Sequence, residues 1–258
     1  MSQGAPSSMG PLSRGAKRAF DIVVAGAALG VTAPLGLAIY VAVRLESPGH
    51  PIYRQRRVGR GGRPFDIYKF RTMVSGAEFI GAGLAVAEGD TRITRVGALL
   101  RRTSLDELPN LFNVLRGEMS IVGPRPTVQV QVDHYTERQR GRLAVKPGIT
   151  GWAQINGRAS LPWSQRIELD LVYVENQSLR LDAQILARTP GMLLGRQGVY
   201  KGATGGWDLT AAPPQHGQDP HGGSVPEADR PGEAAGDTGP SPQATPDRGR
   251  SAGARGRP

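Results

Sequence analysis

Two adjacent carboxylates, Asp106 and Glu107, stand in a stretch that reads as the start of a helix. The stretch runs from Thr103 to Pro126 as TSLDELPNLFNVLRGEMSIVGPRP. An ionised carboxylate can act as a nucleophile, as a general base or as an oxygen ligand for a hard cation. The more ordinary use of acidic residues at a helix start is to cap the helix. The pair is therefore a candidate catalytic site with a plain structural alternative.

The residues around the pair predict a helix that ends at Gly117. Its apolar stripe is Leu108, Leu111, Phe112 and Leu115. The sequence allows two alternative helix caps. Ser104 and Glu107 have the spacing of a capping box, whereas Asp106 as the cap would place Pro109 in the first turn, which tolerates proline. With either cap, we expect the positive end of the helix dipole to keep both carboxylates ionised.

Composition divides the 258 residues into a basic body and a polar tail. From Gly202 onward Gly, Pro, Ala, Ser and Asp dominate, and such a segment cannot bury enough apolar surface to offset its ordering entropy. Residues 202–258 hold five arginines and seven acidic residues, a net charge of −2. Because the whole chain has a net charge of +10, residues 1–201 carry +12. A basic body indicates an anionic partner, such as membrane lipid, nucleotide phosphate or nucleic acid.

The residue types present restrict the metal chemistry. The chain has no cysteine, which excludes disulfides and thiolate metal sites. The body contains two histidines, His50 and His134, so a histidine zinc site is not expected. A metal would need oxygen ligands, which favours Mg²⁺, with Mn²⁺ as the alternative.

One segment is long and apolar enough for a membrane. Ile22 to Val43 contains 22 residues and no charge, and basic residues flank both ends. Because positively charged flanks prefer the cytoplasm, a simple span cannot satisfy both ends. Pro34 lies near the middle, so we expect a helix–break–helix at Ala33 and Pro34 that enters and leaves by one face. The alternative is an ordinary span with a proline kink.

Beyond this segment the chain alternates short strands and helices. Ile52–Val58 and 64–73 are predicted strands joined by a glycine-rich turn, and residues 119–122 are a third. Helices are expected at about 90–102, 128–142, 164–174 and 179–187. The last two are amphipathic and could lie at a membrane interface, although packing on the core is the commoner use.

Several basic residues are placed where they could hold phosphate. Alternation along the second strand puts Lys69 and Arg71 on one face, although solvated strand charges are an equal alternative. Arg101 lies five residues before Asp106. Arg125 stands between two prolines, which limit the conformational freedom it would lose on binding a phosphate.

A glycine-rich stretch follows, from Lys146 to Arg158; it is predicted to be a loop and ends in Gln154, Asn156 and Arg158. Glycines let the backbone approach a ligand closely, so Gln154 and Arg158 are candidate substrate contacts. On its own this is a weak signal. The sequence contains no internal repeat, Walker-type phosphate loop or dinucleotide fingerprint.

Residues 15–200 strongly resemble the bacterial sugar transferase family, the small monotopic polyprenyl-phosphate phosphoglycosyl transferases. The matching stretches are KRAFDI, IYKFRTM, DTRITRVG, TSLDELPNLFNVLRGEMSIVGPRP, KPGITGWAQINGR and ELDLVYVENQSLRLD, in this order. One departure is Ala33, where many relatives have serine. The serine hydroxyl could satisfy backbone groups freed by the break at Pro34.

The resemblance implies transfer of a sugar 1-phosphate from a UDP-sugar to a polyprenyl phosphate such as undecaprenyl phosphate. It makes Asp106 the nucleophile that forms a phosphosugar ester with release of UMP, and it makes Glu107 a magnesium ligand beside it. The family's functional basic positions map onto Lys69, Arg101, Arg125 and Arg158. The product would start a membrane-linked glycan such as an exopolysaccharide, capsule, O-antigen or glycoprotein glycan.

These observations combine into one expected organisation. The fold class is α/β, mostly helical with a small β component, preceded by the re-entrant segment. We expect a disordered segment at 1–13, the membrane segment at 14–46, a catalytic domain at 47–201 on the cytosolic face of the bacterial inner membrane, and a disordered tail at 202–258. Expected partners are the UDP-sugar, polyprenyl phosphate and membrane lipids, but not nucleic acid; a second copy of the chain stays open.

Two other functions compete with the covalent transferase. In the first, the lipid phosphate attacks the sugar-proximal phosphorus directly and Asp106 only binds metal. In the second, the protein is a basic membrane-associated scaffold without catalysis. The intact dyad and its basic residues favour an enzyme over the scaffold.

Overall fold

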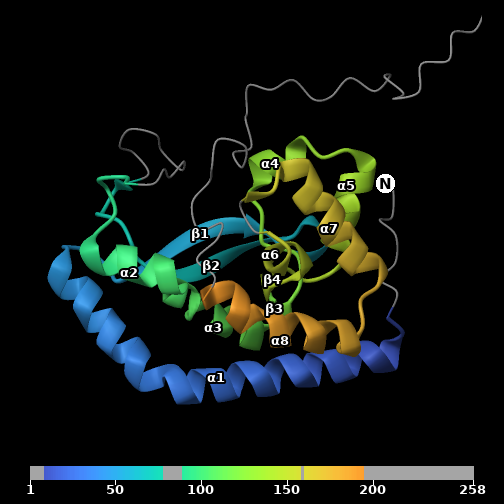
Figure 1. The fold of residues 1–258 in the computed structure, drawn as a ribbon, viewed down its shortest axis with the longest axis horizontal. Coiled ribbons are helices and arrows are strands. Elements are labelled where there is room, and N and C mark those ends of the chain that lie inside the picture. Colours follow the sequence, from blue (N-terminus) through green and yellow to red (C-terminus); the bar gives the residue numbers. More distant parts are fainter. Residues whose placement is uncertain (1–8, 78–88, 158–159, 195–258) are drawn as a thin grey trace, which may run out of the picture. The chain divides into compact units, whose positions relative to one another are not determined.

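A computed structural model describes residues 9–77, 89–157 and 160–194. The expected disordered tail at 202–258 and most of the segment at 1–13 lie outside these ranges. The described chain is mostly helical with two small sheets, which confirms the predicted fold class (Figure 1). Its elements are α1 (Pro11–Glu46), β1 (Ile52–Val58), η1 (Arg60–Gly62), β2 (Pro64–Phe70), α2 (Arg95–Thr103), η3 (Leu105–Glu107), α3 (Asn110–Arg116), β3 (Ser120–Val122), α4 (Gln129–Asp133), α5 (Glu137–Arg140), η4 (Gly141–Ala144), β4 (Gly148–Thr150), α6 (Trp152–Ile155), α7 (Trp163–Glu175) and α8 (Leu179–Leu194).

The strands form two separate pairs. β1 and β2 make the expected antiparallel hairpin, with Ile52 opposite Phe70, and its turn contains Gly61 and Gly62 at positive φ. β2 ends at Phe70, three residues earlier than predicted. β3 pairs in parallel with β4, which lies within the glycine-rich stretch predicted to be a loop.

The two C-terminal helices pack on the core. Tyr173 of α7 and Ile185 of α8 are fully buried in one cluster with Ile67 of β2 and Val114 of α3. These helices therefore contribute to the core, the commoner use of such helices. The helix expected at 128–142 is divided into α4, α5 and η4, and a capping box of Thr136 and Gln139 starts α5.

Helix α1 is the candidate membrane element. It runs unbroken for 36 residues with Pro34 inside it, and Figure 1 shows it bending along its length. The helix thus continues through Ala33 and Pro34, where a break was expected. The Thr32 hydroxyl donates to the Ala28 carbonyl at 2.6 Å, a contact that also bends helices. By length and composition α1 could cross a membrane, and only 11% of its apolar window is buried.

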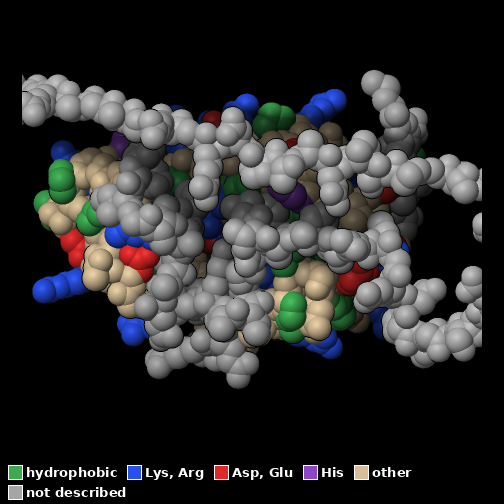
Figure 2. Space-filling model, turned by 90° about the horizontal axis from the view of Figure 1, so that it is seen from above, with side chains coloured by type: hydrophobic (Ala, Val, Ile, Leu, Met, Phe, Trp, Pro, Cys, Tyr) green, Lys and Arg blue, Asp and Glu red, His purple; other side chains and the backbone are tan. Residues whose placement is uncertain are grey.

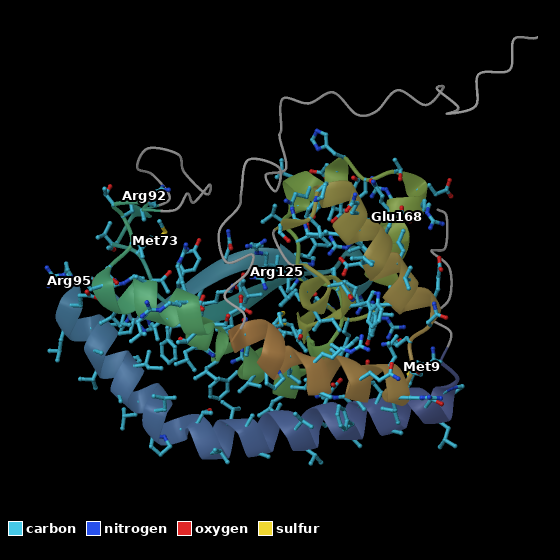
Figure 3. All side chains as sticks on the ribbon, viewed as in Figure 1. Met9, Met73, Arg92, Arg95, Arg125 and Glu168 are labelled. Atoms are coloured by element: carbon cyan, nitrogen blue, oxygen red, sulfur yellow. The ribbon has the colours of Figure 1, made fainter. Side chains whose placement is uncertain are left out.

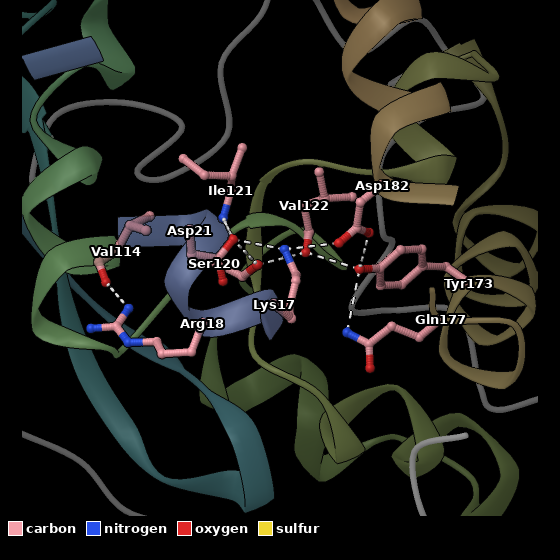
Figure 4. Close-up of polar contacts among 10 residues, drawn as sticks. All are labelled: Lys17, Arg18, Asp21, Val114, Ser120, Ile121, Val122, Tyr173, Gln177 and Asp182. Atoms are coloured by element: carbon pink, nitrogen blue, oxygen red, sulfur yellow. Dashed lines mark hydrogen bonds and ion pairs between the residues drawn. The ribbon is translucent and has the colours of Figure 1, made fainter. Parts of the chain in front are cut away.

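Both ends of α1 are attached to the same body. Near its start, Arg18 donates to the Val114 carbonyl at 2.6 Å (Figure 4) and to the Leu115 carbonyl at 2.8 Å. At its end, the Glu46 carboxylate accepts from the Val96 backbone at 3.0 Å, and Arg71 donates to the Ser47 carbonyl at 2.8 Å. Between these ends, Ala25, Ile39 and Val43 of the apolar stretch are buried in the clusters of the same body.

Candidate active site

The dyad lies in a short turn between two helices. Asp106 and Glu107 belong to η3, and α3 begins only at Asn110. Ser104 adopts a left-handed conformation, φ 57°, and ends the preceding helix α2. Both predicted caps are therefore wrong, because neither the Ser104 side chain nor the Asp106 side chain caps a helix here.

Glu107 is held by two cations from different elements. Its Oε1 accepts from Lys69 Nζ of β2 and from Arg125 Nη2, each at 2.7 Å. Burial opposes ionisation of Glu107, but the charges and hydrogen bonds of Arg125 and Lys69 outweigh it and hold its pKa below the usual range. Arg125 lies near the middle of the body in Figure 3 and is half exposed, so part of its guanidinium faces solvent.

The pKa of Asp106 shifts in the opposite direction to that of Glu107. Its carboxylate has no hydrogen-bond partner among the described residues. Burial and the negative charge of Glu107 raise the pKa of Asp106 to about 6, although Lys69, Arg125 and Arg101 oppose the shift. The expected helix dipole does not account for this shift, because helix α3 begins only at Asn110. Near neutral pH the carboxylate is still ionised, and it is free to react.

Arg101 reaches the dyad because α2 packs tightly on the end of β2. A Cβ atom at Gly97 would lie 2.0 Å from the Thr72 carbonyl oxygen, so only glycine allows this approach. Arg101 Nε then donates to Thr72 Oγ1 at 2.8 Å, and its charge acts on Asp106. Three predicted cations, Lys69, Arg101 and Arg125, thus surround the two carboxylates.

The sequence matches a known protein family. A family model described as bacterial sugar transferase matches residues 12–196. The chain belongs to the bacterial sugar transferase family.

Three relatives show how this match is distributed. The uncharacterized sugar transferase EpsL of Bacillus subtilis (strain 168) is 44% identical over 72% of this chain and 90% of its own length. A UDP-glucose:undecaprenyl-phosphate glucose-1-phosphate transferase of Caulobacter vibrioides is 43% identical over 74% and 76%. One of the same name from Xanthomonas campestris pv. campestris is 46% identical over 72% of this chain, but that match spans only 40% of the relative.

Of the other predicted site residues of this sugar transferase, neither Arg71 nor Gln154 hydrogen-bonds to the dyad. Because β2 ends at Phe70, Arg71 does not project beside Lys69; it is buried and donates to Ser47 and to the Pro48 carbonyl. Its hydrogen bonds are made to the end of α1, and a phosphate contact by Arg71 stays a prediction. Gln154 is buried on α6 with neither amide atom bonded among the described residues, and its role stays a prediction. Arg158 lies outside the described residues.

Two cations of the site were not foreseen from the sequence. Burial, reinforced by the charge of Arg125, lowers the pKa of Arg57 to about 10, while Glu107 partly opposes this. Burial and the same Arg125 charge also lower the pKa of Arg166. Arg57 is on β1 and Arg166 on α7, so no local motif joins either of them to the dyad. Arg125 repels both Arg57 and Arg166, so the two carboxylates do not neutralise all the positive charge around them. The remaining positive charge is available for an anionic ligand.

The dyad supplies ligands that suit magnesium without enclosing it. No group of three or more His, Asp or Glu side chains gathers anywhere in the described ranges, so the protein offers no complete metal cage there. Mg²⁺ is usually held by one or two carboxylates together with substrate phosphates. The free carboxylate of Asp106 and the second oxygen of Glu107 fit that role.

Proposed function

We propose that this sugar transferase moves a sugar 1-phosphate from a UDP-sugar to a polyprenyl phosphate through an Asp106 ester. Relatives named as UDP-glucose:undecaprenyl-phosphate glucose-1-phosphate transferases supply the two substrate classes. The observation that carries the proposal is the Asp106 carboxylate, which has no hydrogen-bond partner among the described residues and lies within a surplus of cations. A diphosphate brings the negative charge that such a site lacks.

The reaction divides into two displacements. An Asp106 oxygen forms a bond to the sugar-proximal phosphorus, and the bond from that phosphorus to the bridging oxygen breaks, so UMP leaves with the electron pair. An oxygen of polyprenyl phosphate then attacks the same phosphorus, which releases Asp106 and yields the polyprenyl diphosphate sugar. Only phosphorus–oxygen bonds change, so the anomeric configuration of the sugar is retained.

Each charged residue has a defined part in these steps. Arg125 and Lys69 fix Glu107 and place positive charge beside the transferred phosphoryl group. Arg101 contributes charge on the Asp106 side. Mg²⁺, held by Asp106 and Glu107, would neutralise the diphosphate when bound.

The attachment of α1 supports a re-entrant membrane segment. At 1.5 Å per residue, a helix of 36 residues is about 54 Å long, well beyond the roughly 30 Å of a bilayer core. Yet Arg18 and Glu46, near its two ends, both bond to the body. Because one body cannot lie on both sides of a membrane, we propose that α1 enters and leaves by the cytosolic face and holds the dyad near the lipid phosphates.

The reaction is tested by following UMP. Membranes containing the full chain are incubated with undecaprenyl phosphate and, one at a time, a panel of UDP-sugars. We expect UMP release with at least one sugar, dependent on the lipid and abolished by EDTA until Mg²⁺ is restored. Membranes containing an Asp106→Asn variant are the control. No UMP above that control with any sugar would contradict the proposed activity.

The topology can be tested because the chain has no cysteine of its own. Ser13→Cys and His50→Cys place single thiols at exposed positions near the two ends of α1. We expect a membrane-impermeant maleimide to label both in inside-out vesicles and neither in right-side-out vesicles. A helix that spans the membrane would instead expose one cysteine on each side.

A further inference from the structure

A buried arginine lies behind the turn that carries Arg125. Arg142 of η4 is 4% exposed, and its Nη2 donates to the Arg125 carbonyl oxygen at 3.0 Å. The same nitrogen donates to Asp170 Oδ2 of α7 at 2.5 Å, and Nη1 donates to the Tyr135 hydroxyl. The guanidinium also lies 5.7 Å from the ring centroids of both Tyr135 and Trp163. Its position is therefore fixed from several directions.

Hydrogen bonds to backbone carbonyl groups hold the turn at residues 124–127 in place. The Pro124 carbonyl accepts from Gly148 N at 2.8 Å, and the Thr127 carbonyl accepts from Val58 N at 2.8 Å. The two prolines beside Arg125 have no N–H to donate. Between these backbone contacts, the Arg125 carbonyl is held by the Arg142 side chain. A substitution at Arg142 can therefore loosen the turn while the residues of the turn stay unchanged.

Stability alone does not account for such an arrangement. A buried ion pair is costly to desolvate, and replacing both partners by apolar residues is often neutral or stabilising. What the pair does supply is direction, because the planar guanidinium presents its donors in a fixed geometry. Here one donor direction ends on Asp170 and another on the backbone of the residue that contacts Glu107.

We propose that Arg142, oriented by Asp170, is a positioning residue that holds the backbone of Arg125 so that its guanidinium meets Glu107 and the substrate phosphate. The phosphate part rests on the proposed function. Arg142 itself does not touch the dyad; it acts through Arg125. A displacement of about 1 Å in such a group can cost about 100-fold in rate, so a loosened turn affects turnover before it affects folding.

The test compares Arg142→Lys and Asp170→Asn with a matched pair. Arg138 and Glu168 form an exposed ion pair at 2.8 Å that also joins the segment before η4 to α7, so Arg138→Lys and Glu168→Gln are the controls. In full-length enzyme, we expect the two buried variants to lose about 10- to 100-fold in kcat, with a much smaller change in KM. The controls should stay within about twofold of wild type.

Two further measurements separate positioning from general structural support. Combining Arg142→Lys with Arg125→Ala should cause no more loss than Arg125→Ala alone, because both changes act through one guanidinium. Hydrogen exchange should increase in peptides covering residues 123–131 in Arg142→Lys, but not in Arg138→Lys. This second readout does not depend on activity.

The outcomes are distinct. Unchanged kcat despite faster exchange in the turn, or losses that multiply in the double variant, would overturn the positioning role. Wild-type enzyme that releases no UMP would instead overturn the proposed function. In that case exchange still decides the inference, since a turn as protected in Arg142→Lys as in wild type would refute it.

Discussion

Asparagine in place of Asp106 is expected to reduce sugar-phosphate transfer by at least about 1,000-fold and to make the metal-free protein more stable. The first effect follows because an amide cannot form the phosphosugar ester. The second follows from the carboxylate's surroundings, since Asp106 has a raised pKa and no bonding partner among the described residues. The same substitution therefore separates function from stability.

The sign of the stability effect can be worked out from the pKa. The ordinary value is 3.8 and the folded value is about 6. As pH rises from about 4 to 6, the unfolded chain ionises Asp106 while the folded chain resists, so folding becomes less favourable. Above about pH 6 the full cost is present, and asparagine removes it. We expect a gain of about 1 kcal/mol at neutral pH in EDTA, after allowing for solvent screening.

Glu107→Gln is the matched comparison within the same dyad. It removes the charge that accepts from Lys69 and Arg125, so it should lower both activity and stability, the latter by about 1–2 kcal/mol. Urea unfolding in EDTA and labelling with a radioactive UDP-sugar measure the two effects. Asp106→Asn enzyme that still transfers sugar phosphate within tenfold of wild type would refute the ester mechanism and favour direct attack by the lipid phosphate. Equal destabilisation by both variants would refute the contrast between the two carboxylates.

Local patterns predicted the parts of the fold that depend on local residues. The hairpin β1–β2 and the helices α7 and α8 follow from alternation, glycine turns and helical spacing. The start of the dyad helix did not, because Ser104 belongs to the end of α2 and takes a left-handed conformation there. The Ser104 and Glu107 spacing is equally compatible with both arrangements, and only the packing of α2 on β2 decides between them.

Local sequence patterns were also insufficient to predict which residues meet at the site. Strand alternation placed Arg71 beside Lys69, but the strand ends one residue before Arg71, and that side chain turns to Ser47. Arg57 and Arg166 come from elements distant in sequence from the dyad and meet near Arg125 only after the chain folds. Arg142 had no sequence signal either, since its importance lies in one bond to a backbone carbonyl. Charges brought together by tertiary packing are therefore what the sequence patterns could not show.

A second large effect is expected where α1 meets the body. Lys17 lies between two buried carboxylates, 2.7 Å from Asp21 Oδ1 and 2.9 Å from Asp182 Oδ2 (Figure 4). Asp21 also accepts from Ser120 Oγ and from the Ile121 backbone, and Tyr173 donates to Asp182. One ammonium group therefore compensates two carboxylates that join α1 to β3 and α8.

Lys17→Met removes the cation from this cluster and leaves both carboxylates without their ionic partner. Breaking a buried pair on one side costs about 3–5 kcal/mol, which for a domain of this size lowers the melting temperature by about 6–20 °C. Burial already raises the pKa of Asp182 against the opposing charge of Lys17, so the variant should favour protonated Asp182 and lose less stability at lower pH.

The comparison that decides this prediction uses neighbouring positions on the same helix. Arg14→Met removes an exposed cation one turn before Lys17 and should change the melting temperature of the full-length protein by less than about 2 °C. Lys17→Met combined with Asp182→Asn should recover part of the loss, because one of the two uncompensated charges is removed with its partner. Equal melting temperatures for Lys17→Met and Arg14→Met would show that this cluster does not hold α1 to the body. A double variant no more stable than Lys17→Met would show that charge is not the reason for the loss.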